Sequence, residues 1–164
     1  MRVDIRDPKW NFIQGHKLGD TILFPATGYL YLAWKVFADR HGADVNCFPI
    51  EFRTVNFRRM TVIDDTAPVD FQFNFLLESG QFEIREGGSL VVEGTLRKIE
   101  HFEEDYFSYP GNVASSDVVA LSKMDFYKET GIRGYKFSDH FRSISRATVE
   151  GTRKIFAYNS SNRD

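Results

Sequence analysis

The sequence predicts an α+β fold in which a curved antiparallel sheet wraps around one long buried helix. Two observations predict it. Residues 29–37 are almost wholly apolar on every side of a helix, which is typical of a helix buried all round. Residues 69–77 alternate between apolar and polar side chains, which is typical of a strand with one buried face. A helix without a polar face needs a cover, and an antiparallel sheet provides one.

The first forty residues lead into this helix. Residues 1–13 read as a polar lead-in with an edge strand near its end. A tight polar turn that holds His16 follows, and a short β-branched and aromatic strand is expected at residues 21–24. Pro25 should end that strand, and the hydroxyl of Thr27 is expected to cap the helix.

Further strands are expected through the middle of the chain. Residues 48–63 predict one or two strands with an irregularity near Thr54. Turns at residues 78–80 and 86–88 join residues 69–77 to the two strands that follow, which predicts a three-stranded meander.

Composition and charge restrict the classes of function. The formal net charge is −2, so we expect neither nucleic acid nor an anionic membrane as a partner. No apolar run is long enough to span a bilayer and no secretory leader is visible, which leads us to expect a cytoplasmic protein. Cys47 is the single cysteine, and the histidines lack metal-ligand spacing, so we expect no metal site. The sixteen phenylalanines suit a thick core or a tunnel for an acyl chain.

His16 is the candidate catalytic residue, with a structural histidine in a turn as the alternative reading. Flanking glycines, Gly15 and Gly19, allow the backbone to bend and another segment to approach. His16, Pro25 and the run FPATGYL resemble the HxxxGxxxxP motif of the dehydratase domain of animal-type fatty acid synthases and of the related modular polyketide synthases. The run LFPATGYLYLAWK is similar to the animal form, which implies an insect or other invertebrate synthase. One departure is visible, because Asp20 stands where the family has glycine and Gly19 comes one residue early.

A second stretch, GIRGYKFSDHF, resembles the GYxYGPxF motif that opens the second half of the same domain. The positions that match or nearly match are Gly134, Tyr135, Phe137 and Phe141. Ser138 and Asp139 stand where the family has glycine and proline, and Phe137 replaces the second tyrosine, which puts the role of those positions in doubt.

The resemblance implies a double hot-dog fold, of which this chain holds the first half and an incomplete second half. We expect an N-terminal hot dog over residues 1–100, a linker over residues 101–122, and the start of a C-terminal hot dog over residues 123–164. The family's second catalytic residue, an aspartate on the helix of the second hot dog, is expected beyond Asp164. This chain alone is therefore expected to be inactive.

The function implied by the resemblance is removal of water from 3-hydroxyacyl thioesters to give trans-2-enoyl thioesters during fatty acid biosynthesis. His16 would be the base, and backbone N–H groups at the start of the helix would stabilise the thioester oxygen. The expected substrate-binding residues are Gly19, Asp20, Pro25, Thr27, Gly28, Tyr135 and Phe137. The step needs no cofactor, and the acyl chain would arrive on the phosphopantetheine of an acyl carrier protein. The other synthase domains and a second copy of the parent protein are the further partners implied.

Two alternatives remain open. The altered Gly19–Asp20 order and the altered second motif favour a pseudo-dehydratase or a structural fragment that keeps the fold without turnover. A free-standing hot-dog thioesterase or acyl-binding protein is the other alternative.

Overall fold

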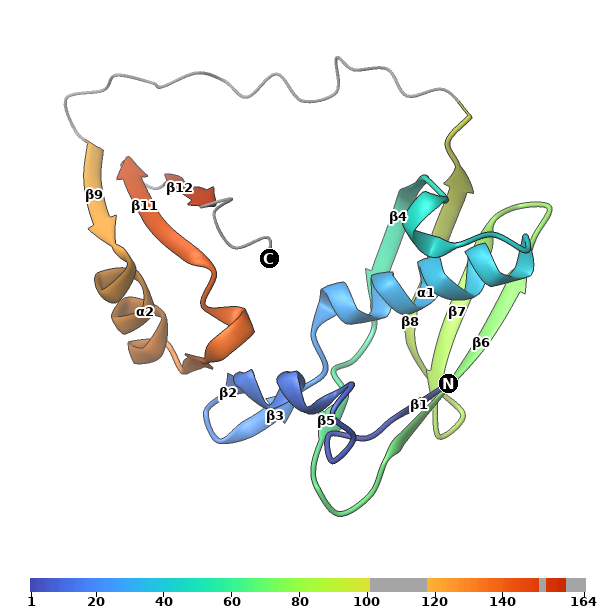
Figure 1. Cartoon of the computed structure of the whole chain (residues 1–164), viewed down its shortest axis with the longest axis horizontal. Coiled ribbons are helices and arrows are strands. Elements are labelled where there is room, and N and C mark those ends of the chain that lie inside the picture. The colour runs from blue at the N-terminus through green and yellow to red at the C-terminus, as the bar shows by residue number, and fades with distance from the viewer. Residues whose placement is uncertain (101–117, 151–152, 159–164) are drawn as a thin grey trace. The chain divides into compact units, whose positions relative to one another are not determined.

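The computed structural model describes residues 1–100, 118–150 and 153–158, and the chain divides into two compact units (Figure 1). The first unit comprises residues 1–13 and 21–103, and the second comprises residues 14–20 and 104–164. The short stretch that carries His16 therefore belongs to the second unit.

The first unit is built on a five-stranded antiparallel sheet with the strand order β1-β6-β7-β8-β4. Its strands are β1 (Arg2–Val3), β4 (Ile50–Phe57), β6 (Val69–Leu76), β7 (Gln81–Glu86) and β8 (Ser89–Lys98). Two shorter strands, β3 (Thr21–Leu23) and β5 (Val62–Ile63), form a separate antiparallel pair. The meander predicted from the alternating pattern is confirmed.

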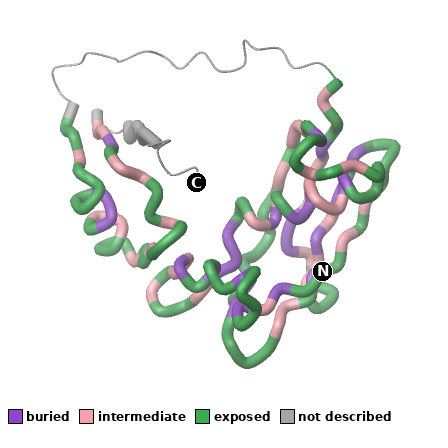
Figure 2. The backbone as a smooth tube through the Cα atoms, in the orientation of Figure 1, coloured by how far each residue is buried: buried purple, intermediate pink, exposed green. Residues whose placement is uncertain are grey.

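Helix α1 (Ala26–Arg40) lies across the five-stranded sheet and contacts β6 and β7 (Figure 1). The residues of α1 that face the core are Tyr29, Leu32, Ala33, Phe37 and Ala38. They pack with Phe71, Phe82 and Ile84 of the sheet into one core, and Figure 2 shows the buried residues along both elements. This antiparallel sheet around one helix is the hot-dog arrangement, so the predicted α+β class is confirmed.

Burial of α1 on every side was a wrong prediction. Tyr31, in the middle of the helix, is 46% exposed, and Leu30 and Trp34 are only half-buried. Trp34 donates its indole N–H to the carbonyl of Phe48 at 2.7 Å, so it packs its ring while its polar edge reaches a partner. Aromatic residues can occupy a half-exposed face in this way, which is why an apolar sequence did not require full burial.

The irregularity predicted near Thr54 is a break in the pairing of β4 with β8, where the register shifts between Phe52 and Thr54. Gly94 lies opposite Val55 at this point. A Cβ atom on Gly94 would lie 2.2 Å from the carbonyl oxygen of Thr54, so only glycine permits this approach of the two strands.

Residues 1–13 are not the polar lead-in that the sequence predicted. Val3 pairs with Val69 of β6 and is fully buried, and Ile5, Trp10 and Ile13 also enter the core. The edge strand expected near the end of this stretch is absent, because residues 11–15 form a short 3-10 helix, η1 (Asn11–Gly15), whereas β1 at the other end of the stretch is an edge strand of the sheet. Isolated apolar residues at irregular spacing gave no periodic signal there.

The second unit contains helix α2 (Lys123–Ile132) and two antiparallel sets of strands. The strands are β2 (His16–Leu18), which pairs with β10 (Tyr135–Phe137), and β9 (Val118–Ser122), β11 (Ile144–Glu150) and β12 (Arg153–Tyr158), which pair in the order β12-β11-β9. Of the linker predicted over residues 101–122, residues 101–117 lie outside the described residues. Residues 118–122 form β9, so the linker prediction was wrong there.

Candidate active site

His16 begins strand β2, where it lies opposite Phe137 of β10. Its imidazole is half-buried against two aromatic rings, with centroid distances of 5.5 Å to Phe137 and 5.0 Å to Phe141. The sequence predicted His16 inside a tight turn, but the turn comes only after β2, at Gly19 and Asp20. The ring is therefore fixed by a strand and by aromatic packing.

Gly15 explains how β10 reaches the histidine. The N–H of Ser138 donates to the carbonyl of Gly15 at 3.0 Å. A Cβ atom at position 15 would lie 2.7 Å from the Ser138 carbonyl oxygen and 3.2 Å from the ring of Phe141. The absence of a side chain at Gly15 thus lets the end of β10 and the following aromatic residue close against His16.

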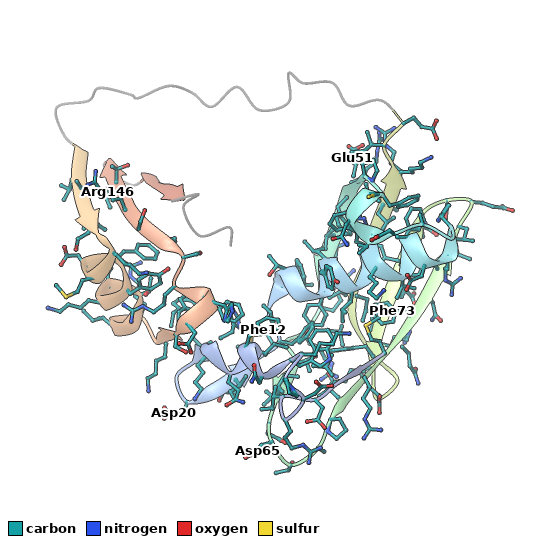
Figure 3. The ribbon with its side chains drawn as sticks, viewed as in Figure 1. Phe12, Asp20, Glu51, Asp65, Phe73 and Arg146 are labelled. Carbon is teal, nitrogen blue, oxygen red and sulfur yellow. The ribbon has the colours of Figure 1, made fainter. Side chains whose placement is uncertain are left out.

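The transposed Gly19–Asp20 pair has a structural role in the second unit. Gly19 adopts φ +61°, which favours glycine, and its N–H donates to the carbonyl of Gly134 at 2.7 Å. Asp20, labelled in Figure 3, accepts a hydrogen bond at 2.7 Å from Lys136, and this bond and the charge of Lys136 hold the pKa of Asp20 below its usual value. The expected substrate-binding residues Gly19 and Asp20 thus both bind the β10 segment.

In the first unit, the start of α1 carries the expected Pro25, Thr27 and Gly28. Pro25 is buried and occupies the N-cap position, but Thr27 is exposed and no side chain caps the helix, so the predicted cap was wrong. The N–H of Gly28 donates to the carbonyl of Pro25 at 2.9 Å. A Cβ atom on Gly28 would lie 2.9 Å from the ring of Phe24, so this glycine is needed for packing.

The loop after β10 departs from the motif that it resembles. Asp139, at the family's proline position, has φ +47°, which proline cannot adopt. The Ser138 hydroxyl donates to the Asp139 carboxylate at 3.1 Å. Tyr135 is 46% exposed, whereas Phe137 is half-buried against His16. Of the two expected substrate-binding residues in this motif, the structure therefore brings Phe137, and not Tyr135, against the histidine.

Two residues of interest were missed by the sequence reasoning. Phe141 matched the second motif but was given no role, although it packs closer to His16 than Phe137 does. Thr61 is fully buried between β4 and β5, in a stretch where apolar and polar residues alternate only in part. No motif or spacing could have revealed it.

Other features of the described residues lie away from these positions. A groove of about 600 Å³ runs over the five-stranded sheet, and the chemistry-bearing side chains that line it include Asn56, Asn74, Gln81, Glu83 and Glu93. None of the expected site residues lines it.

Within residues 1–100, 118–150 and 153–158, no three His, Cys, Asp or Glu side chains come together as metal ligands. The helices of these segments are too short or too polar to cross a membrane.

Comparison with known proteins gives a family model and several structural relatives. The model of the polyketide synthase dehydratase domain matches residues 3–86. The dehydratase domain from the CurF module of the curacin polyketide synthase is 18% identical with a TM-score of 0.67, over 89% of this chain and 53% of that chain. The GphF dehydratase is 17% identical with a TM-score of 0.69, over 95% of this chain and 55% of that chain.

The dehydratase domain from the CurK module of the curacin synthase is 19% identical with a TM-score of 0.65, over 94% of this chain and 55% of that chain. Two CurK variants, one with histidine changed to phenylalanine and one with aspartate changed to asparagine, are described as inactive mutants. At these identities the likeness shows a shared fold. The chain spans about half the length of the solved structures that it matches.

Proposed function

This chain belongs to the polyketide synthase dehydratase domain family, and from this premise we propose that it forms part of a dehydratase that removes water from 3-hydroxyacyl thioesters. The product is the trans-2-enoyl thioester. The observation that carries the proposal is the packing of His16, at the histidine position of the motif, against Phe137 and Phe141. A histidine held in this way is a suitable general base, because histidine is the side chain that most often serves in this role and its ring is packed between two aromatic residues.

The reaction assigns three roles. His16 takes the proton from the carbon next to the thioester carbonyl. The N–H groups in the first turn of α1, around Thr27, stabilise the charge that develops on the thioester oxygen. A protonated carboxylic acid gives its proton to the departing hydroxyl. Asp20 and Asp139 are exposed to water and not enclosed in an apolar site, so neither suits this third role.

The inactive CurK variants support a histidine and an aspartate as the paired groups in that relative. We extend the same pairing to this protein, with His16 as the histidine. Pro25 and Phe137 are proposed to shape the acyl site, and Gly19, Asp20, Gly28 and Tyr135 to contribute through the segments that they hold.

The setting of the reaction is a further part of the proposal. The acyl chain is carried on the phosphopantetheine of an acyl carrier protein within a multifunctional, dimeric cytoplasmic synthase. The run LFPATGYLYLAWK resembles the animal fatty acid synthase form of the motif, which favours an animal-type fatty acid synthase over a modular polyketide synthase. Residues 1–100 and 123–164 would then belong to the first and second hot dogs of one domain.

A non-catalytic role is the second candidate. The positive φ of Asp139 at the family's proline position favours it, since the loop after β10 cannot have the backbone of the motif. A protein of this kind would bind acyl thioesters without converting them.

Replacement of His16 tests the proposal. A complete dehydratase domain that contains this chain and its His16→Ala variant are assayed with a 3-hydroxyacyl N-acetylcysteamine thioester by following enoyl formation. We expect turnover by the unsubstituted domain and a loss of roughly 10²- to 10⁴-fold in the variant, which is the range for removal of a general base. His41→Gln, at the exposed end of α1, is the matched control and should keep full activity. Binding without turnover would support the second candidate, and equal activity of His16→Ala would refute the first.

A further inference from the structure

Among residues 1–100 and 119–149, Thr61 is the single polar residue that is buried. It lies between β4 and β5, in a segment that is held by its backbone, since the N–H groups of Arg58 and Arg59 both donate to the carbonyl of Val91. Burial of a hydroxyl is unfavourable unless it is hydrogen-bonded, so the bonds of Thr61 identify what it does.

Three groups of Thr61 bind three different residues. Its backbone N–H donates to the hydroxyl of Tyr29 at 3.2 Å. Its carbonyl accepts from the N–H of Phe24 at 3.0 Å. Its own hydroxyl donates to the carboxylate of Glu86 at 2.8 Å, and Arg59 donates to the same carboxylate at 2.6 Å.

These bonds attach the start of α1 to Thr61 on both sides of its first turn. Phe24 immediately precedes Pro25, and Tyr29 follows the first turn, so Thr61 holds the stretch 24–29 at both ends. The rings of Phe24 and Tyr29 pack edge to face at a centroid distance of 4.7 Å, and Tyr29 is 3% exposed. The Glu86 carboxylate ties this arrangement to the end of β7, which is part of the rigid five-stranded sheet.

We propose that Thr61 is a positioning residue, which fixes the first turn of α1 for the acyl thioester by joining Phe24 and Tyr29 to the Glu86 carboxylate. The proposal deepens the proposed function and rests on it, because it gives that turn its role toward the thioester oxygen. N–H donors stabilise a developing negative charge only when their positions are fixed before the reaction. A displacement of about 1 Å in such a group can lower the rate by about 10²-fold.

The first arm of the test measures kinetics. Thr61→Val removes the hydroxyl and keeps the volume, whereas Thr61→Ser keeps the hydroxyl. In the complete domain and with the N-acetylcysteamine thioester, we expect Thr61→Val to lower kcat by roughly 10- to 100-fold with KM nearly unchanged, and Thr61→Ser to keep most of kcat. Thr95→Val, on β8, is the matched control and should leave kcat unchanged. An unchanged kcat in a folded Thr61→Val variant would overturn the proposal.

The second arm needs no turnover. Amide hydrogen exchange, resolved by NMR on the full chain, reports the bond from Phe24 to Thr61 directly. Thr61→Val and Tyr29→Phe should each speed exchange at the Phe24 amide by about tenfold, while the amide of Val92 in β8 keeps its rate. Unchanged exchange at Phe24 in both variants would overturn the positioning role.

The two arms separate the failures. If the unsubstituted complete domain shows no turnover, the proposed function is refuted, and the exchange arm alone decides whether Thr61 positions α1. If Thr61→Val exchanges faster at Phe24 and yet keeps its kcat, Thr61 is structural and the inference is wrong, while the proposed function stands.

Discussion

His16 shows how one residue acquires a defined setting from neighbours that are distant in sequence. Phe137 and Phe141 lie more than one hundred positions after it, and β10 brings both rings to it. Gly15 makes this possible because it has no Cβ atom, which would lie 2.7 Å from the Ser138 carbonyl oxygen. The environment of the histidine therefore depends on apolar contacts, which can be tested separately from any activity.

Phe141→Leu is expected to loosen His16 without unfolding the second unit. The variant keeps an apolar side chain but loses the ring contact, which contributes about 0.5–1.5 kcal/mol in aromatic pairs. We expect the ring-proton NMR signals of His16 to move toward the positions of a solvated histidine, because the ring current of Phe141 is gone. Phe57→Leu, on a 48% exposed residue of β4, is the control and should leave those signals in place. Unmoved signals in Phe141→Leu would contradict the packing.

At the scale of single residues, the sequence pointed to His16 as a candidate because it matches the histidine of the motif. The Gly19–Asp20 order was visible because it departs from the same motif. It did not identify what Asp20 binds, because its partner Lys136 is 116 positions away. Thr61 was not identifiable either, since a threonine in an irregular segment gives no sign of burial.

Helix α1 illustrates what the element scale adds. Its bounds followed from Pro25 and from the return of charged residues at its end, which is local information. Which of its faces is covered depends on the sheet, and Tyr31 lies on a face that the sheet leaves open. The position of its first turn depends on Gly28, against which the ring of Phe24 packs.

Two glycine-to-alanine replacements in helices should have opposite effects. Gly28→Ala would place a methyl group 2.9 Å from the buried Phe24 ring, so we expect a loss of about 1–3 kcal/mol in the free energy of unfolding of the first unit. Gly131→Ala in α2 meets no atom within 4 Å and should gain up to about 1 kcal/mol from helix propensity. Urea denaturation of the two variants and the unsubstituted chain checks both, and a stabilising Gly28→Ala would show that the ring can move aside.

For the whole molecule, the charged and phenolic groups set the pH range of stability. Hydrogen bonds from the Arg6 side chain lower the pKa of Asp4 to about 2, and hydrogen bonds from Thr66 lower the pKa of Asp64. Burial raises the pKa of Tyr29 above its usual value, while hydrogen bonds from Thr61 oppose this change. The carboxylates and the phenol therefore limit stability at opposite ends of the pH scale.

Stability should accordingly be flat between about pH 4 and pH 10 and fall on both sides. The folded pKa values of the carboxylates lie below the unfolded values, so their contribution is present above about pH 4 and is lost as the pH falls toward 2. The pKa of Tyr29 is higher in the folded state than in the unfolded state, so the phenol loses its proton more readily when the chain unfolds. Stability therefore also falls above about pH 10. Urea midpoints across the pH range measure both limbs. Asp4→Asn should weaken the acid limb and Tyr29→Phe the alkaline limb, and unaltered limbs would contradict these assignments.

The grouping of residues 14–20 with the second unit was not readable from the sequence. Residues 14–20 stand beside α1 in the chain and carry the first motif, yet they are grouped with the second unit because β2 pairs with β10. Strand pairing over so long a separation leaves no local pattern, whereas the meander of the first unit joins neighbouring strands through short turns and was predicted.

The pairing of β2 with β10 has a practical consequence for anyone who shortens this protein. A product that ends at residue 100 would still contain the entire histidine motif and all of α1. It would nonetheless lack Phe137 and Phe141, the two aromatic residues that pack against the imidazole. The motif would be complete in such a product, but His16 would have lost these two contacts.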